Sequence, residues 1–227
     1  GKKPGEDSLR KRLNISSSTH VVTFAAECIE GTPDEPVLVD ALIKLVTEGA
    51  FGESVLIIRL HPSDRVEYYL NKYQGIGYPV ILDIPDAGFA AENNWEVGSS
   101  ESIIHFVKLM KESDVVITGG STIALDAMLF DTPVIGIKFN MTIPTTSWNS
   151  AHYGFTTNHF RRIVESDAIY LPESLDELVS CVTHCLHNPK EKTHQRKFVV
   201  DQTIPDLPSA KMVVSSIKKA LKGPPTV

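Results

Sequence analysis

Short, continuously apolar runs alternate with longer segments of helical periodicity along most of this 227-residue chain. Apolar and polar residues do not alternate within the runs, which is typical of strands buried on both faces of a parallel sheet. The runs are residues 20–26, 54–60, 78–82, 114–118, 133–137 and 168–171. Strands that alternate with helices at this spacing predict βαβ units and therefore an α/β fold.

The segments between the runs carry apolar stripes at helical spacing. Segment 36–48, for example, places Leu38, Leu42 and Leu45 on one stripe. The predicted helices cover 36–48, 63–73, 100–112, 121–130 and 174–187, with surface helices at 189–200 and 208–222. Together with the runs they predict a doubly wound, mostly parallel, six-stranded Rossmann-like sheet with helices on both faces. Residues 139–160 show neither helical nor strand periodicity. This predicts a long loop, and such loops are often functional.

The two ends of the chain differ from this pattern. Residues 1–12 contain five Lys or Arg and a Pro-Gly pair, and they predict an N-terminal extension that is either a linker or an exposed first helix. Residues 13–222 form the predicted Rossmann-like domain, and residues 223–227 form a tail. The chain begins with Gly rather than Met, so we expect it to be a piece of a longer protein.

Composition excludes several classes of protein. Asp and Glu total 28 against 22 Lys and Arg, and a net charge of −6 argues against nucleic-acid binding. Three cysteines are too few for a disulfide framework, which favours a reducing compartment. No apolar run approaches the roughly 20 residues that span a bilayer, and the N-terminus does not resemble a signal peptide. These features predict a cytoplasmic location.

A glycine pair after the fourth run is the strongest candidate for a ligand site. The strand is followed by Gly119, Gly120, Ser121 and Thr122, which open a predicted helix. Glycines let a ligand approach the main chain, and the start of a helix favours an anion. Asp126 lies one turn further on, where it is expected to reach a sugar hydroxyl of the same ligand. A tight turn with an N-cap is the alternative interpretation.

Arg59 and His61 follow the second run in the sequence Arg-Leu-His-Pro. Proline restricts the preceding histidine to extended geometry, so both side chains are expected to point off the strand end. We expect them to contact the same anion. In the 139–160 segment, His152 or Lys138 is a further candidate for a phosphate contact, and Trp148 or Tyr153 for stacking on a base. His61 and His152 are the candidate catalytic side chains.

Several motifs are absent from the sequence. There is no P-loop glycine-lysine motif, and Asp-x-Asp does not occur, so no divalent-metal diphosphate site is expected. The segment from Cys181 to His187 superficially resembles a metal cluster. On a helix, however, its cysteines share the apolar stripe and its histidines face outward, so no metal is predicted.

The stretch "SDVVITGGSTIALDAMLFDTPVIGI" together with Arg59-Leu60-His61-Pro62 resembles the C-terminal, donor-binding half of GT-B glycosyltransferases and their relatives. Similar segments occur in the N-acetylglucosaminyltransferase of peptidoglycan synthesis, in UDP-GlcNAc 2-epimerases and in CDP-glycerol transferases of teichoic acid synthesis. The His-Pro pair is shared with the last group and with bacterial sialyl- and Kdo-transferases. The resemblance covers residues 13–222.

The resemblance implies a function as well as a fold. Gly120, Ser121 and Thr122 would bind donor phosphate, Asp126 the ribose hydroxyls, and His61 phosphate. It implies a metal-independent transfer from a nucleotide-activated donor in polysaccharide or glycoconjugate synthesis, with the donor as substrate and no cofactor. It also implies a missing N-terminal acceptor domain that supplies the general base unless His152 does, and it allows peripheral membrane association of the full-length protein.

Three other functions remain open. A UDP-GlcNAc 2-epimerase would use the same pocket without a separate acceptor. A CDP-glycerol glycerophosphotransferase would transfer glycerol phosphate, which the His-Pro pair favours. A nucleotide-binding or interaction module would bind without catalysis.

Overall fold

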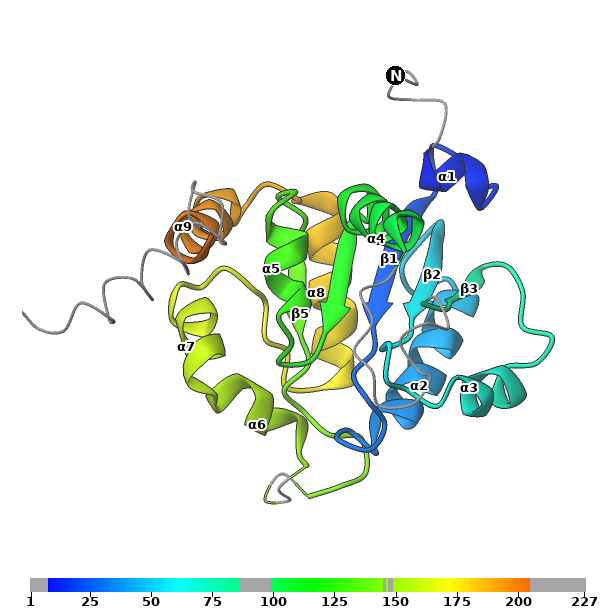
Figure 1. Cartoon of the computed structure of the whole chain (residues 1–227), viewed down its shortest axis with the longest axis horizontal. Coiled ribbons are helices and arrows are strands. Elements are labelled where there is room, and N and C mark those ends of the chain that lie inside the picture. The colour runs from blue at the N-terminus through cyan, green and yellow to red at the C-terminus, as the bar shows by residue number, and fades with distance from the viewer. Residues whose placement is uncertain (1–7, 86–98, 145, 147–148, 205–227) are drawn as a thin grey trace, which may run out of the picture.

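The computed structural model describes residues 8–85, 99–144, 146 and 149–204. Its centre is a parallel sheet of five strands in the order β3-β2-β1-β4-β5 (Figure 1). The strands are β1 (His20–Ala25), β2 (Ser54–Arg59), β3 (Val80–Asp83), β4 (Val115–Thr118) and β5 (Val134–Gly136). The predicted doubly wound α/β class is confirmed.

The prediction of a sixth strand is wrong. Residues 168–171 lie beside β5 and form one isolated parallel bridge, between Tyr170 and Ile135. Tyr170 accepts a hydrogen bond from Gly136 N and donates one to Val134 O. Pro172 follows two residues later, and proline has no N–H with which to continue a ladder. The apolar run is therefore a contact with the sheet edge rather than a strand.

Helices cover both faces of the sheet. Val22, Leu56 and Ile117 pack against helices on one face, whereas Val21, Ile57 and Val116 face the other layer. The first layer contains α2 (Glu35–Thr47), α3 (Val66–Lys72) and α8 (Leu175–His187). The second contains α1 (Leu9–Arg12), α4 (Ser100–Glu112), α5 (Ile123–Met128), α6 (Ala151–Thr156), α7 (Asn158–Glu165) and α9 (Thr193–Thr203). None of the helices in the described residues has the length and apolarity needed to cross a bilayer.

The segment predicted as a long loop at 139–160 contains α6 and the start of α7. Ser150 caps α6, because its Oγ accepts a hydrogen bond from His152 N at 3.3 Å. Phe155 of α6 and Phe160 of α7 are buried against the second layer and meet edge to face. The spacing of Phe160, Ile163 and Val164 is the helical signal that identifies α7 in the sequence.

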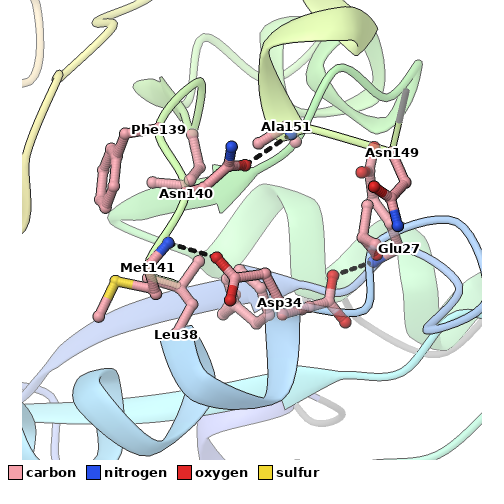
Figure 2. A pocket seen from close by; sticks show the side chains of 13 residues that line it. Glu27, Asp34, Leu38, Phe139, Asn140, Met141, Asn149 and Ala151 are labelled. Carbon is pink, nitrogen blue, oxygen red and sulfur yellow. Dashed lines mark hydrogen bonds between the residues drawn. The ribbon is translucent and has the colours of Figure 1, made fainter. Parts of the chain in front are cut away.

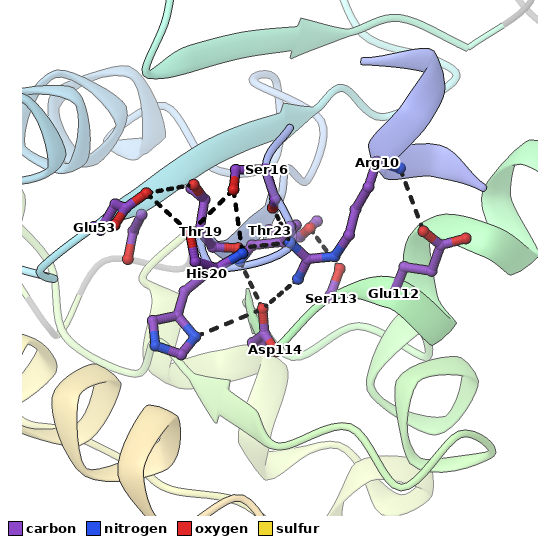
Figure 3. A network of polar contacts seen from close by, with 12 residues as sticks. Arg10, Ser16, Thr19, His20, Thr23, Glu53, Glu112, Ser113 and Asp114 are labelled. Atoms are coloured by element: carbon purple, nitrogen blue, oxygen red, sulfur yellow. Dashed lines mark hydrogen bonds and ion pairs between the residues drawn. The ribbon is translucent and has the colours of Figure 1, made fainter. Parts of the chain in front are cut away.

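Within the region predicted as a linker or an exposed first helix, Leu9–Arg12 form helix α1, and this helix is packed on the domain. Leu9 is buried in α1, and its N–H donates to Glu112 of α4 at 3.0 Å. Arg10 donates to the Thr19 carbonyl at 2.6 Å and pairs with Asp114 at 3.0 Å. Figure 3 shows this network at the N-terminal edge of the sheet. Residues 1–7 and the predicted helix and tail at 208–227 lie outside the described residues.

The strand order predicts a ligand-binding crevice at one point along the edge formed by the carboxyl ends of the strands. The chain proceeds from β1 outward through β2 to β3, then crosses to the other side of β1 to form β4 and β5. In open parallel sheets, ligands bind outside the carboxyl ends of the strands where this direction reverses. That point lies between the ends of β1 and β4.

Candidate functional site

A cavity of about 330 Å³ opens at the carboxyl edge of the sheet, and we call it the His61 cavity. The ends of β1 and β2, helix α4 and the turn into α5 form its walls. Among the residues predicted from sequence, its lining includes Arg59, His61, Ser121, Thr122 and Asp126. The remaining lining is mainly apolar, from Ala25, Ala26, Leu60, Pro62, Ser102, Ile103, Phe106 and Ile123.

His61 is a neutral hydrogen-bond donor in this cavity. Its Nδ1 accepts a hydrogen bond from Ser63 N at 3.1 Å, so the ring proton of the neutral form lies on Nε2. Partial burial lowers the pKa of His61, against an opposing effect of the nearby Asp64 carboxylate. A neutral imidazole with a free Nε2–H can donate to a phosphate oxygen.

Arg59 lines the cavity from the end of β2, and two other side chains hold it in place. Its Nη1 pairs with Asp83 at 2.9 Å, and His105 Nε2 lies 2.6 Å from the other Asp83 oxygen. Burial would raise the pKa of Asp83, but the His105 hydrogen bond and the Arg59 charge together lower it. No described residue accepts a hydrogen bond from Arg59 Nε or Nη2. These nitrogens are the donors that remain for a ligand.

The turn into α5 contributes polar groups with few internal partners. Thr122 is the N-cap of α5, yet its hydroxyl makes no capping hydrogen bond. Ser121 Oγ receives only a long contact from Ile123 N, at 3.5 Å. Burial raises the pKa of Asp126, whose carboxylate has no hydrogen-bond partner in the described part of the chain. Because α5 has only six residues, its dipole is a smaller attraction for an anion than the predicted helix 121–130 implied.

The glycine pair is required by packing within the protein. A Cβ on Gly120 would lie 2.4 Å from the Gly154 backbone in α6, and one on Gly119 would lie 2.5 Å from the Glu27 carboxylate. Neither glycine is among the residues that line the His61 cavity. The close approach that the glycines permit is therefore to α6 and to Glu27.

Lys138 and His152 lie apart from the His61 cavity. The Lys138 ammonium pairs with Glu173 at 2.7 Å. His152 is exposed on α6 and, like Lys138, is not among the residues that line the His61 cavity. Trp148 lies outside the described residues.

A second cavity lies beside the first, and we call it the Glu27 cavity (Figure 2). Its volume is about 40 Å³, and Gly119 forms part of its wall. Glu27, Asp34 and Glu35 line it, and none of them was identified from sequence. The other lining residues are Phe24, Thr32, Leu38, Ile137, Phe139, Asn140, Met141, Asn149 and Ala151. The only sequence signal was the position of Glu27 just after a predicted strand.

The acids of the Glu27 cavity differ in their partners. Asp34 accepts hydrogen bonds from the N–H groups of Met141 and Thr142. Glu35 accepts from Tyr69 Oη at 3.0 Å and from Glu27 N at 2.7 Å. Burial raises the pKa of Glu35 to about 8 and, less strongly, that of Glu27. No hydrogen bond within the described ranges reaches the Glu27 carboxylate.

One group of side chains in the described residues has the composition of a metal site. Ligand atoms of Cys28, Glu30 and Asp64 lie within 4.8 Å of one another. Arg65 Nε, however, lies 2.6 Å from Glu30 Oε1 and already compensates its charge. Burial also raises the pKa of the Cys28 thiol, which disfavours the thiolate that a metal requires. We therefore assign no metal to this cluster.

Comparison with known proteins gives matches in structure alone. No protein-family model matches the sequence, and no curated protein matches it. The C-terminal CMP-Kdo binding domain of WaaA from Acinetobacter baumannii aligns with a TM-score of 0.53 at 16% identity, over 85% of this chain and 94% of that domain. A putative UDP-N-acetylglucosamine 2-epimerase from Listeria monocytogenes aligns with a TM-score of 0.55 at 14% identity, over 86% of this chain and 43% of the epimerase.

The spinosyn forosaminyltransferase SpnP aligns with a TM-score of 0.52 at 13% identity, over 93% of this chain and 46% of SpnP. The chain thus spans nearly all of the WaaA domain but less than half of the other two proteins. At these identities the alignments show a shared fold. The predicted resemblance to the donor-binding half of GT-B enzymes is confirmed at that level.

Proposed function

We propose that this chain is the donor-binding domain of a metal-independent glycosyltransferase that uses a nucleotide-activated sugar. The observation that carries the proposal is the His61 cavity, which gathers Arg59, His61, Ser121 and Asp126 where the strand order reverses. Its cation and hydroxyls suit a phosphate, and its free carboxylate suits a sugar hydroxyl. The shared fold with a CMP-Kdo binding domain and with a forosaminyltransferase supports the same function.

In the proposed reaction, the bond between the anomeric carbon and the donor phosphate breaks, and the leaving nucleotide gains negative charge. Arg59 and the Nε2–H of His61 donate to the phosphate oxygens, and the hydroxyls of Ser121 and Thr122 add neutral donors. Fixed donors of this kind stabilise developing charge without a metal. In this proposal the acceptor hydroxyl, bound by a further domain, forms the new bond to the anomeric carbon and gives its proton to a general base, which is supplied by that domain or is the exposed His152.

An epimerase is the second candidate, because a putative UDP-N-acetylglucosamine 2-epimerase shares the fold. An epimerase changes the sugar without an acceptor. Incubation of the full-length protein with UDP-GlcNAc alone, followed by analysis of the released sugar, separates the two functions. A new sugar formed without an acceptor supports the epimerase, whereas transfer that requires an added acceptor supports the transferase. Transfer of glycerol phosphate from CDP-glycerol is tested in the same way.

The Ser121→Ala and Asp126→Ala variants are expected to weaken nucleotide binding about tenfold each, because each removes a hydrogen bond worth roughly 1–1.5 kcal/mol. Their folding is expected to be unchanged, since neither side chain makes a strong internal hydrogen bond. Calorimetric titration with UDP, CDP and CMP measures the dissociation constants. The control is Ser180→Ala in α8, on the other layer. Wild-type affinity in both site variants would exclude this turn from the binding site.

A further inference from the structure

The Glu27 cavity adjoins the position proposed for the donor phosphates. Gly119 lines the Glu27 cavity, while Ser121 and Thr122 line the His61 cavity. A donor whose phosphates contact Ser121 and Thr122 therefore lies within a few residues of the wall of the Glu27 cavity at Gly119. The His61 cavity, about 330 Å³, falls in the range of small-ligand pockets and can hold a nucleoside. The Glu27 cavity, about 40 Å³, has room only for a small part of the group that is transferred.

No basic side chain is found among the described residues that line the Glu27 cavity. Three carboxyl groups line it, and one of them, Glu35, is mostly neutral at pH 7 because burial raises its pKa to about 8. Asp126 of α5 lines the other cavity, and the Lys138 ammonium is paired with Glu173.

Glu27 is the acid of this cavity that has acceptor capacity left. Asp34 is engaged by the main chain of residues 141–142, and both oxygens of Glu35 already accept hydrogen bonds. The Glu27 carboxylate has no such partner in the described part of the structure, and both its oxygens lie beside Gly119. In the view of Figure 2, Glu27 and Asn149 lie on one side of the cavity, and Phe139 and Met141 lie on the other.

These groups discriminate between ligands by charge. A ligand hydroxyl or ammonium can donate to the Glu27 carboxylate and gains a charge-assisted hydrogen bond. A ligand carboxylate would lie beside the Glu27 and Asp34 carboxyl groups and the apolar side chains of Phe24 and Leu38, and no described lining residue supplies a compensating cation. Discrimination of this kind arises from the rejection of the wrong group as much as from attraction of the right one.

We propose that the Glu27 cavity receives part of the transferred group of the donor, that Glu27 accepts a hydrogen bond from it, and that the cavity selects uncharged or amino-bearing groups over carboxylated ones. The inference rests on the proposed function, and it narrows the donor class to nucleotide-activated neutral sugars, amino sugars or polyols. Glu27 is then a specificity-determining residue of the donor site.

The test compares two donors that differ in one charge. Calorimetric titration of the purified chain with UDP, UDP-glucose and UDP-glucuronate gives the affinity of each sugar nucleotide relative to UDP. We expect UDP-glucose to bind at least tenfold more tightly than UDP-glucuronate. If GDP binds better than UDP, the comparison is GDP-mannose with GDP-mannuronate, each relative to GDP.

The Glu27→Gln variant is expected to reduce this preference to threefold or less, while its affinity for free UDP stays within twofold of wild type. The matched control is Glu30→Gln, an exposed acid three residues further on, which is expected to keep the full preference. Equal binding of the two donors by the wild type would overturn the inference and leave the proposed function standing. A full preference in Glu27→Gln would exclude Glu27 as its cause. Failure to bind any nucleotide would overturn the proposed function as well.

Discussion

The Gly120→Ala substitution is expected to lower the free energy of unfolding by about 3 kcal/mol. The new Cβ would lie 2.4 Å from the Cα and carbonyl carbon of Gly154 and 2.8 Å from its oxygen. These atoms belong to the backbone of α6, so no side chain can rotate away to make room. The turn after β4 or helix α6 must shift, and Phe155 of α6 is buried in the second layer. Urea unfolding followed by circular dichroism measures the loss.

The control for this variant is Gly77→Ala. No heavy atom lies within 4 Å of a Cβ built at Gly77, and its φ is not in the left-handed region. Alanine there is expected to leave the stability unchanged or to raise it by up to about 1 kcal/mol, because it restricts the unfolded chain. If Gly120→Ala and Gly77→Ala unfolded at the same urea concentration, the close crossing of the β4–α5 turn with α6 would be wrong.

The sequence predicts the sheet well where the signal is local. The run 54–60 is apolar without alternation from Val55 to Ile58, and these residues of β2 are indeed buried between two helical layers. Helix α4 begins at Ser100 and ends at Glu112, which are the predicted bounds. It begins there because Ser99 caps its first turn. The run at 168–171 is equally apolar, yet its pairing depends on how far it follows β5 before Pro172, which no local pattern specifies.

The topology explains why the site residues lie close together, but it does not explain which charged side chains pair with one another. Parallel strands bring their carboxyl ends to one edge, so Arg59, His61 and Ser121 were predictable neighbours. Which cation remains available depends on partners that are distant in sequence. Lys138 is paired with Glu173, while Arg59 is oriented by Asp83 and His105. Glu27 was missed for the same reason. Its carboxylate, just after β1, lies beside Gly119, just after the neighbouring strand β4, and no local pattern in the sequence indicates this contact.

Few described cations at the carboxyl edge of the sheet are available to a ligand, so phosphate binding at the proposed donor site depends on Arg59. Arg65 pairs with Glu30, and Lys138 pairs with Glu173. Among the described residues that line the His61 cavity, Arg59 is the permanently charged cation, and His61 is neutral because burial lowers its pKa. A diphosphate bound there would depend mainly on the guanidinium for charge compensation.

The Arg59→Gln variant is accordingly expected to raise the dissociation constant of the preferred nucleoside diphosphate about a hundredfold. That corresponds to roughly 3 kcal/mol, the upper range for hydrogen bonds to a charged group. Arg59→Lys keeps the charge and the pairing with Asp83 but loses the planar fork, so its expected loss is about tenfold. Calorimetric titration with UDP, CDP and CMP measures both losses.

The fold is expected to survive Arg59→Gln, because Asp83 keeps its contact with His105. Circular dichroism and the urea midpoint check this before binding is measured. Arg65→Gln is the matched control, since it removes an exposed arginine from the same edge of the sheet without altering the His61 cavity. Its affinity for nucleotides is expected to equal that of the wild type. A folded Arg59→Gln variant with wild-type affinity would mean that the donor phosphates bind elsewhere. The variant lacks the one permanently charged cation among the described residues that line the cavity.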